Sequence, residues 1–576
     1  MRLRQQVLMF IVACMASHAQ AKDFVVPEEL FNLDLEQLQN VRVVTAAKKS
    51  QRLYDSAAAV YVISSHDIER SGATHIAELL RTVPGLNVAR IDSNKWAVSA
   101  RGFNGRLANK LLVLIDGRSV YSPIFAGVLW DDIDMRLEDI DRIEVVRGPG
   151  STLWGANAVN GVINIITKSA QQSQNAQITA LLGKPESQLS ARVASGNEAS
   201  ALRVFGKTSF NRESASAVAY AKPEDRWNNQ RAGLRWDTNL AAGKSLMLSS
   251  ELYQSEIQET NLVPSAALRS NEIQKEKRNN HGGYLLTRYT SGTDNQVTTG
   301  QFYVDFYRRE DVALLIDART VDAEIQHQFN VQNNDIIFGL GARQNHDDTD
   351  PGQVTRLTPA SATHTLYNLF IQDEISAFDD HLKLTLGNKF EHYDYVDTES
   401  LPNIRALWKV SDNTAVWTAA SKSVRTPDRV ERDTYGLLSA LDPLQGGNPF
   451  SLPVLAYVHG NPDFKLEKIT SYELGFRTQL GQNLEMDIAS FYSKYKNGIT
   501  FEPTSIRCQP SDQSLPCAPT DTYISADAMT GNNLNDNSKG IEAVLRWTAT
   551  GWDVETNFTY QEHDFYYVNN SQDKTR

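Results

Sequence analysis

The chain has 576 residues, a formal net charge of −12 and 41% hydrophobic residues, which is too long for one ordinary compact domain. The acidic balance argues against a nucleic-acid-binding protein and against a polybasic membrane-surface anchor, because both need a basic face. With 22% charged residues, the composition is that of neither a disordered chain nor a bundle of membrane helices.

Residues 1–21 have the pattern of an export signal. A basic start is followed by a short apolar run over 7–16 and by a small-x-small cleavage site at 19–21. The apolar run is too short to span a bilayer as a helix. The alternative is lipoprotein processing at Cys14. In either case the sequence predicts an exported protein.

Residues 22–47 are expected to form a tether. Its last part is rich in β-branched side chains and predicts a short extended strand, made of Val41, Arg42, Val43, Val44, Thr45 and Ala46.

Residues 48–170 predict a compact α+β domain. Apolar and β-branched runs indicate strands at 58–63, 111–115, 143–146 and 162–167. An acidic first turn indicates a helix beginning at Ser65, and a second short helix is expected to end before Pro84-Gly85.

From about residue 173 the pattern is that of β structure alone. Strand-like segments of ~8–15 residues follow one another with repeated alternation. Tight turns at every second junction alternate with long loops, at 213–228, 259–279, 425–469 and 501–536. Short turns on one side and long loops on the other are typical of a transmembrane barrel. A soluble all-β protein is the alternative.

Several segments resemble the TonB-dependent outer-membrane receptors, and in particular their siderophore receptors. The most specific match runs from Arg142 to Gly155 and continues over 160–168, which is similar to the end of the family's plug domain. Further matching blocks lie at 88–103, 421–427, 461–475 and 539–542.

This resemblance covers nearly the whole mature chain and implies its fold class. The fold is expected to be mainly β, an antiparallel transmembrane β-barrel over 171–576 with the α+β plug domain, residues 48–170, inside the lumen.

The resemblance also implies contacts between plug and barrel. Arg101 and Arg147 of the plug are expected to face Glu473 and Glu542 of the wall. Charge pairs suit a plug that must move in a hydrated bore, because water can replace them when the plug is pulled. Removing one partner of a buried pair is costly. The alternative is that these are unrelated solvated charges.

For the segment 41–46, the resemblance names TonB as the partner. Pairing of its backbone with the edge of a partner's sheet gives grip without much side-chain specificity. The outer membrane holds no ATP, so the work must arrive mechanically from the inner membrane. A disordered linker is the alternative.

Ligand capture is expected on the long loops and on the plug apices that face them. Cys508 and Cys517 are close in an exported chain and predict a disulfide that stiffens the loop 501–536. His459 lies in an interval where haem receptors of the family carry a histidine, so it is a candidate iron ligand. An ordinary surface histidine is the alternative. No other metal site and no cofactor are expected.

The function implied is an energised outer-membrane receptor that imports a scarce ligand, by default a ferric siderophore, with haem, cobalamin and glycans as open alternatives. Its expected partners are TonB with its inner-membrane complex, outer-membrane lipid and a small iron chelate, with no nucleic acid. A passive channel or adhesin would need neither plug nor coupling strand. A secreted hydrolase would need a motif such as Gly-x-Ser-x-Gly, and none is found, so no enzyme is expected.

The strand count raises a further expectation. We count about 17 candidate strands, whereas a plugged outer-membrane transporter has ~22 and bacterial barrels normally have an even number. The family normally ends on a strand that closes with an aromatic residue, and Arg576 does not fit that pattern. The sequence therefore predicts a C-terminally truncated barrel lacking about five strands.

Overall fold

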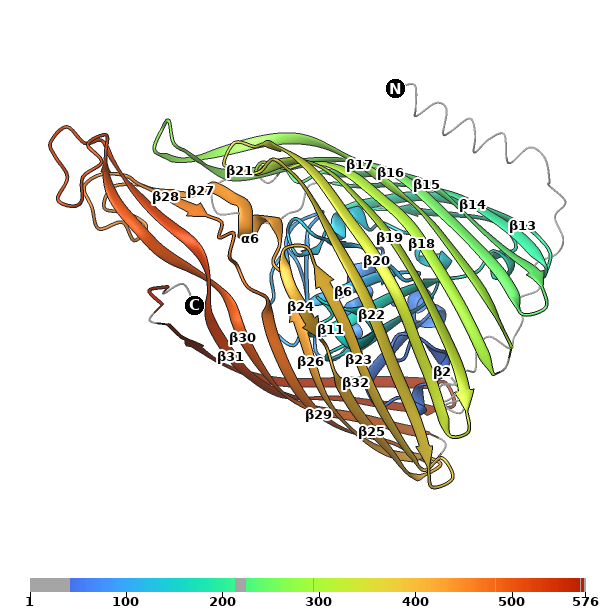
Figure 1. The fold of residues 1–576 in the computed structure, drawn as a ribbon. Coiled ribbons are helices and arrows are strands. Elements are labelled where there is room, and N and C mark those ends of the chain that lie inside the picture. The colour runs from blue at the N-terminus through green and yellow to red at the C-terminus, as the bar shows by residue number, and fades with distance from the viewer. Residues whose placement is uncertain (1–41, 213–223, 294, 482, 570, 574–576) are drawn as a thin grey trace.

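The computed structural model describes residues 42–573 apart from 213–223, 294, 482 and 570. A large curved sheet of 21 strands surrounds a smaller mixed domain (Figure 1). The expected signal peptide, most of the expected tether and Val41 lie outside the described residues. Within the described ranges, no helix has the length and the apolar character needed to cross a membrane.

The smaller domain, called the plug below, is built on a five-stranded mixed sheet in the order β3-β10-β11-β6-β7. Strand β10 pairs antiparallel with β3 and β11, whereas β6 runs parallel to β11. The strands of the plug are β1 (Arg42–Val43), β2 (Gln51–Arg52), β3 (Ala59–Ser64), β4 (Leu86–Arg90), β5 (Trp96–Ala100), β6 (Leu111–Ile115), β7 (Arg118–Ser119), β8 (Tyr121–Ser122), β9 (Gly127–Val128), β10 (Ile140–Arg147) and β11 (Gly161–Thr167). Its α-helices are α3 (Ser65–Ser71), α4 (Ile76–Leu79) and α5 (Ser151–Trp154).

The local sequence explains these elements. All five residues of β6 are buried, as expected for an apolar strand covered on both faces. Helix α3 begins after Ser64, which forms a capping box with Asp67, and ends at Gly72 in the left-handed conformation. The strands and helices that the sequence predicts within the plug are present, with bounds shifted by a few residues.

The large sheet, called the wall below, is mainly an antiparallel meander from β12 to β32. Its long strands are β12 (Asn175–Leu182), β13 (Glu186–Gly196), β14 (Ser200–Asn211), β15 (Trp227–Ala241), β16 (Lys244–Ser265), β17 (Ser270–Thr293), β18 (Gln296–Glu310), β19 (Leu314–Val331), β20 (Asn334–Pro351), β22 (Ser361–Ala377), β23 (Leu382–Tyr393), β25 (Asn403–Ser411), β26 (Thr414–Arg425), β29 (Glu467–Leu480), β30 (Leu484–Gln509), β31 (Tyr523–Ala549) and β32 (Trp552–Tyr567).

The sequence-based count of about 17 strands matches the long strands of the wall, and the sheet as a whole has 21. Four shorter strands lie inside segments that the sequence presents as connections: β21 (Thr355–Leu357), β24 (Val396–Ser400), β27 (Thr434–Leu441) and β28 (Val454–His459). They are formed by pairing across the sequence, as in the parallel contact of β28 with β31, and carry little periodicity of their own.

The connections sort by length to the two ends of the wall. Short turns at 242–243, 332–333 and 412–413 lie at one end, and the connections with α6 (Arg429–Asp433), β27 and β28 lie at the other (Figure 1). Because short turns face the periplasm and long loops face outward in such barrels, we call these the periplasmic end and the loop end.

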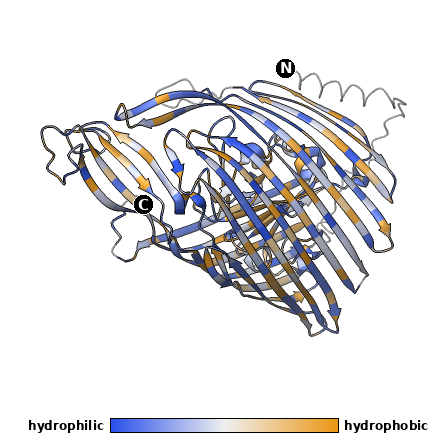
Figure 2. Cartoon of the chain, turned by 45° about the horizontal axis from the view of Figure 1, so that its top comes forward, coloured by the Kyte–Doolittle hydropathy of each residue, from blue (hydrophilic) through white to orange (hydrophobic). Residues whose placement is uncertain are grey.

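The outer face of the wall is apolar where it would meet lipid. On β22, Tyr367, Leu369 and Ile371 are exposed, whereas the alternating Phe370 and Gln372 are buried. Figure 2 shows the hydrophobic colour recurring along the wall strands. An exposed apolar band on alternating positions is what a membrane-spanning barrel requires.

The wall has two ends in the hydrogen-bonding direction, at β12 and β32. Among the described residues, no pairing joins these two strands. The expectation that the barrel lacks strands stays a prediction.

Candidate functional site

The candidate coupling segment is docked on the plug. Arg42 and Val43 pair with β2, and Val43 is fully buried. The backbone N–H groups of Val44 and Thr45 then donate to Glu144 Oε2 at 2.9 and 2.8 Å, and Thr45 Oγ1 donates to the same oxygen at 2.6 Å. One buried carboxylate oxygen therefore satisfies three donors of the segment.

Among the described residues, the expected extended strand covers Arg42 and Val43, and a turn follows from Thr45. The prediction of a strand as far as Ala46 is wrong, because the contact with Glu144 bends the chain where the local sequence favours extension. Trp154 Nε1 also donates to the carbonyl oxygen of Thr45 at 2.7 Å.

The residues that follow the tether contact the wall at the periplasmic end. Lys49 Nζ lies 2.6 Å from Oδ2 of Asp335, which is the second residue of β20. Tyr54 donates its hydroxyl hydrogen to the carbonyl oxygen of Ser411, at 2.9 Å, beside a short turn. A force applied from the periplasm to the tether therefore acts at the foot of the plug.

The four charges expected to join plug and wall lie together. Arg101 Nη1 is 2.7 Å from Glu473 Oε1, and Arg101 Nε is 3.0 Å from Glu542 Oε1. Arg147 Nη1 lies 3.2 Å from Glu542 Oε2. All four side chains are almost completely buried, so each charge depends on its partners rather than on water. We call this group the ion-pair cluster.

Two glycines allow the backbone of the plug to approach the cluster. A Cβ at Gly148, where φ is +98°, would lie 2.3 Å from Glu473 Oε1, and one at Gly85 would lie 2.4 Å from Glu542 Oε1. Both positions have positive φ, which glycine adopts without strain. The turn after Arg147 therefore requires glycine for the space as well as for its conformation.

A second buried network lies beside the cluster, and the sequence reasoning missed it. Lys110 of the plug lies 2.6 Å from Glu467, and Arg425 lies 3.0 Å from Glu467 and 2.7 Å from Glu431. Burial lowers the pKa of Lys110, although Glu467 opposes the shift. Arg425 and Glu467 belong to the matching blocks 421–427 and 461–475, so those motifs could have indicated this second network.

Other ion pairs join plug and wall around the lumen. They include Lys95 with Glu259, Asp131 with Arg309, Asp134 with Lys207, and Lys48 with Glu324. No local pattern marks these residues, because each pair joins residues far apart in the sequence. The plug is thus held by charges on several sides.

A cavity of about 450 Å³ lies between the plug and the wall from β17 to β23. We call it the chamber. Its lining includes Val44 and Lys48 near the foot of the plug, and His364, Tyr395 and Arg432 near the loop end. Sequence reasoning gave no indication of this space.

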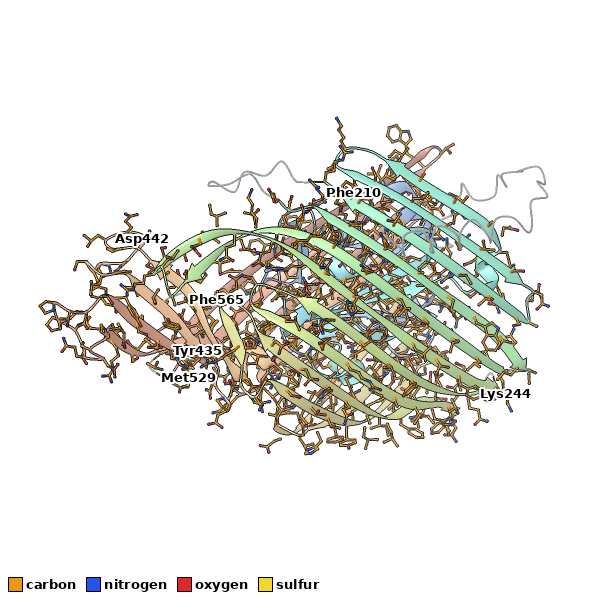
Figure 3. The ribbon with its side chains drawn as sticks, turned by 90° about the horizontal axis from the view of Figure 1, so that it is seen from above. Phe210, Lys244, Tyr435, Asp442, Met529 and Phe565 are labelled. Atoms are coloured by element: carbon orange, nitrogen blue, oxygen red, sulfur yellow. A yellow bond between two sulfur atoms is a disulfide. The ribbon has the colours of Figure 1, made fainter. Side chains whose placement is uncertain are left out.

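The loop end carries aromatic side chains around β27 and β28. His459 is partly exposed; its Nε2 lies 3.1 Å from Asp527 Oδ1, and its ring meets that of Tyr435 edge-on at 5.0 Å. Tyr435 in turn stacks on Tyr457. Figure 3 shows Tyr435 and Met529 at this end and Lys244 at the other.

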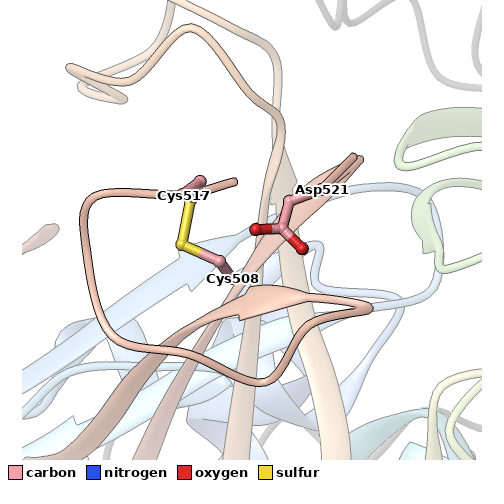
Figure 4. A group of neighbouring side chains, drawn as sticks. All are labelled: Cys508, Cys517 and Asp521. Atoms are coloured by element: carbon pink, nitrogen blue, oxygen red, sulfur yellow. A yellow bond between two sulfur atoms is a disulfide. The ribbon is translucent and has the colours of Figure 1, made fainter. Parts of the chain in front are cut away.

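Cys508, near the end of β30, and Cys517, in the connection to β31, form a disulfide with their Cα atoms 5.3 Å apart. Asp521 lies beside them (Figure 4). Its carboxylate accepts hydrogen bonds from the backbone N–H groups of Ser511 and Ala518. Because both sulfur atoms are in the disulfide, the three residues fix the loop rather than offer thiolate ligands.

A plug held by buried ion pairs inside an antiparallel barrel defines a class of gated outer-membrane transporter. Similarity of the sequence to known protein families identifies which class of transporter this is. Residues 52–162 match the TonB-dependent receptor plug domain, and residues 176–576 match the TonB-dependent receptor-like β-barrel. The chain therefore belongs to the TonB-dependent receptors, which are outer-membrane transporters and not enzymes, and which act with TonB.

Similar proteins include two whose names indicate different functions. The iron-regulated outer membrane virulence protein of Vibrio cholerae is 26% identical over 505 residues, covering 82% of this chain and 71% of the relative. The vitamin B12 transporter BtuB of Vibrio vulnificus is 24% identical, covering 80% and 71%. Neither identity decides the ligand.

Among solved structures, a mutant of the ferric enterobactin receptor PfeA from Pseudomonas aeruginosa has a TM-score of 0.70 at 17% identity, covering 88% of this chain and 80% of that one. The siderophore receptor PirA from Acinetobacter baumannii has a TM-score of 0.68 at 16% identity, with 90% and 81% covered. At these identities the likeness supports the fold.

Proposed function

We propose that this chain imports a ferric siderophore, and that TonB drives the import by pulling the segment Val41–Ala46. The described part of this segment is docked at the foot of the plug through Glu144. Its neighbours in sequence contact the periplasmic end of the wall. This placement supports a role in transmitting force from the periplasm.

The ion-pair cluster is proposed to hold the plug in the lumen until it is pulled. Breaking a buried pair from one side leaves an uncompensated charge, which keeps the resting plug in place. When the plug shifts and water enters, both partners can be hydrated. The cluster thus holds the plug firmly at rest and still allows its ion pairs to separate once water enters.

The observation that carries the ligand class is a set of arginine–tyrosine pairs at the loop end. The guanidinium of Arg356 lies 4.6 Å from the ring centre of Tyr435, and that of Arg432 lies 4.6 Å from the ring centre of Tyr395. Cationic groups combined with aromatic faces suit a ligand that is anionic and aromatic. A ferric catecholate has both properties.

The relatives support an iron chelate without deciding it. One is named as iron-regulated and the structural neighbours are named as siderophore receptors, whereas another relative is named as a vitamin B12 transporter. Haem is the further alternative, for which His459 is the candidate ligand.

Uptake by iron-starved cells tests the proposal. Cells that express the chain as their one receptor of this class should accumulate radioactive iron from ferric enterobactin, and matched cells without TonB should not. Ferric hydroxamate, haem and cyanocobalamin form the rest of the panel. Uptake of cyanocobalamin or haem alone would reject the siderophore, and equal uptake without TonB would reject the energised mechanism.

A further inference from the structure

We propose that the chamber is the inward part of the ligand's route and that the side chain of Lys48 closes it at the periplasmic end. The inference rests on the proposed import function and goes beyond it by assigning one side of the plug as the passage. It also assigns the gate to a residue outside the ion-pair cluster.

The extent of the chamber is the first argument. A single cavity is lined by Lys48 near the foot of the plug and by His364 and Arg432 near the loop end. Its volume of about 450 Å³ falls within the range of small-molecule sites. A ligand that passes along this side therefore needs an opening at the foot of the plug, and not a new path through the plug.

The chemistry of the lining is the second argument. Cationic side chains are interleaved with carboxylates and tyrosines on the wall: Arg288, Arg343, Lys389, Asp322, Glu391 and Tyr303. Arg343 Nε donates to Asp322 at 2.8 Å, so part of this charge is already compensated. A polar chelate can exchange its water for such groups one at a time.

Lys48, the first residue after the tether, reaches across to the wall. Its Nζ lies 2.5 Å from Glu324 Oε1, 4.9 Å from the ring centre of Trp154 and 4.7 Å from that of Phe370. The side chain is 6% exposed. One lysine thus bridges a carboxylate and two aromatic rings, which fills the space between the foot of the plug and the wall.

The adjacent lysine has a different place. Lys49 Nζ pairs with Asp335 and Glu374, but Lys49 does not line the chamber. Both lysines therefore anchor the start of the plug to the wall, and Lys48 alone of the two also bounds the chamber.

The order of residues along the chain is the third argument. Lys48 is the third residue after Thr45, which is ~10 Å of extended chain. Among the described residues, it is the first in chain order whose side chain forms an ion pair with the wall. A pull on the coupling segment reaches Lys48 well before Arg101. The foot of the chamber can therefore open while the ion-pair cluster still holds the body of the plug.

Ion conductance of the 576-residue chain in planar lipid bilayers, with potassium chloride as the probe, tests the gate without TonB and without a ligand. K48A should raise the conductance several-fold over the parent chain, and K49A should not. The charge swap K48E with E324K should return the conductance toward the parent value. Equal conductance of K48A and K49A would overturn the gate.

The route has its own matched pair on β18. Thr299 lines the chamber, and the adjacent Thr298 bonds to His327 and does not line it. In the K48A background, T299W should cut the added conductance and T298W should leave it. If both variants conduct alike, the open path lies elsewhere and the chamber is not the route.

The uptake assay judges the proposed function separately. A chain that takes up no iron chelate, yet opens in K48A and is blocked by T299W, would keep the gate and reject import. A chain that imports ferric enterobactin through TonB, yet shows no difference between K48A and K49A, would keep import and reject the gate.

Discussion

Replacing Glu144 should free the candidate coupling segment from the plug. One oxygen of this carboxylate accepts hydrogen bonds from Val44 N, Thr45 N and Thr45 Oγ1, all at 2.9 Å or less. The other oxygen accepts from Arg142 Nε at 2.8 Å. The side chain is fully buried, so water does not compete for these bonds in the docked state.

The size of the effect follows from these three bonds. A hydrogen bond to a charged group contributes about 1.5–3 kcal/mol net. Glutamine keeps the shape and one acceptor oxygen but loses the charge, so we expect E144Q to weaken docking by about 2 kcal/mol, and E144A by about 4 kcal/mol. TonB can bind the segment only when the segment is undocked. The apparent affinity for TonB is therefore the intrinsic affinity multiplied by the undocked fraction. Two kcal/mol then corresponds to roughly 30-fold tighter binding.

Isothermal titration of the purified 576-residue chain with the periplasmic domain of TonB, in the absence of ligand, measures this effect. E144Q should bind more tightly than the parent chain, and E144A more tightly still. D141N is the matched control, because Asp141 pairs with Arg142 on the same strand and does not contact the segment. If E144Q and D141N both bind like the parent chain, Glu144 does not restrain the segment.

Three further outcomes are expected. V43P should abolish TonB-dependent uptake while V43T preserves it, because proline removes the N–H that strand pairing needs; normal uptake by V43P would reject the coupling role. R101M should lower plug stability by about 3–5 kcal/mol in urea-dependent proteolysis, and R101M with E473Q should recover part of that loss; no recovery would mean that the two residues do not depend on each other. The third outcome concerns pH. Burial lowers the pKa of His75 to about 3, so the folded plug resists a proton that the unfolded chain takes up below pH ~6.5. Stability is therefore lost as pH falls, by about 2 kcal/mol at pH 5, and H75N, which keeps an acceptor for Ala77 N, should flatten that loss in thermal unfolding; equal losses would contradict it.

The sequence could predict what depends on local pattern or on a specific motif. The apolar runs of the plug produce its strands because a run such as Leu111–Ile115 fits a strand buried on both faces. Arg101 and Glu473 could be paired from the sequence because each lies in a matching block. The disulfide followed from two cysteines nine residues apart.

Contacts between residues distant in sequence could not be predicted in the same way. Lys48 and Glu324 are separated by 276 positions, and neither stands in a block that marks its partner. The same holds for the bond from Thr45 to Glu144, which turns a segment whose composition favours extension. The short strand β28 exists because β31 lies beside it, so its own sequence does not distinguish it from a loop.

The contacts of the plug differ in the order in which a pull from the periplasm loads them. Those near the tether, at Glu144 and Lys48, each depend on a single side chain and are loaded first. The ion-pair cluster joins Arg101 and Arg147 to two glutamates, and Gly148 brings the backbone close enough to exclude water from Glu473. Because a one-sided break there strands a buried charge, the cluster resists displacement more strongly than the foot does. A pull from the periplasm should therefore remodel the foot of the plug first and displace the whole domain only at greater force.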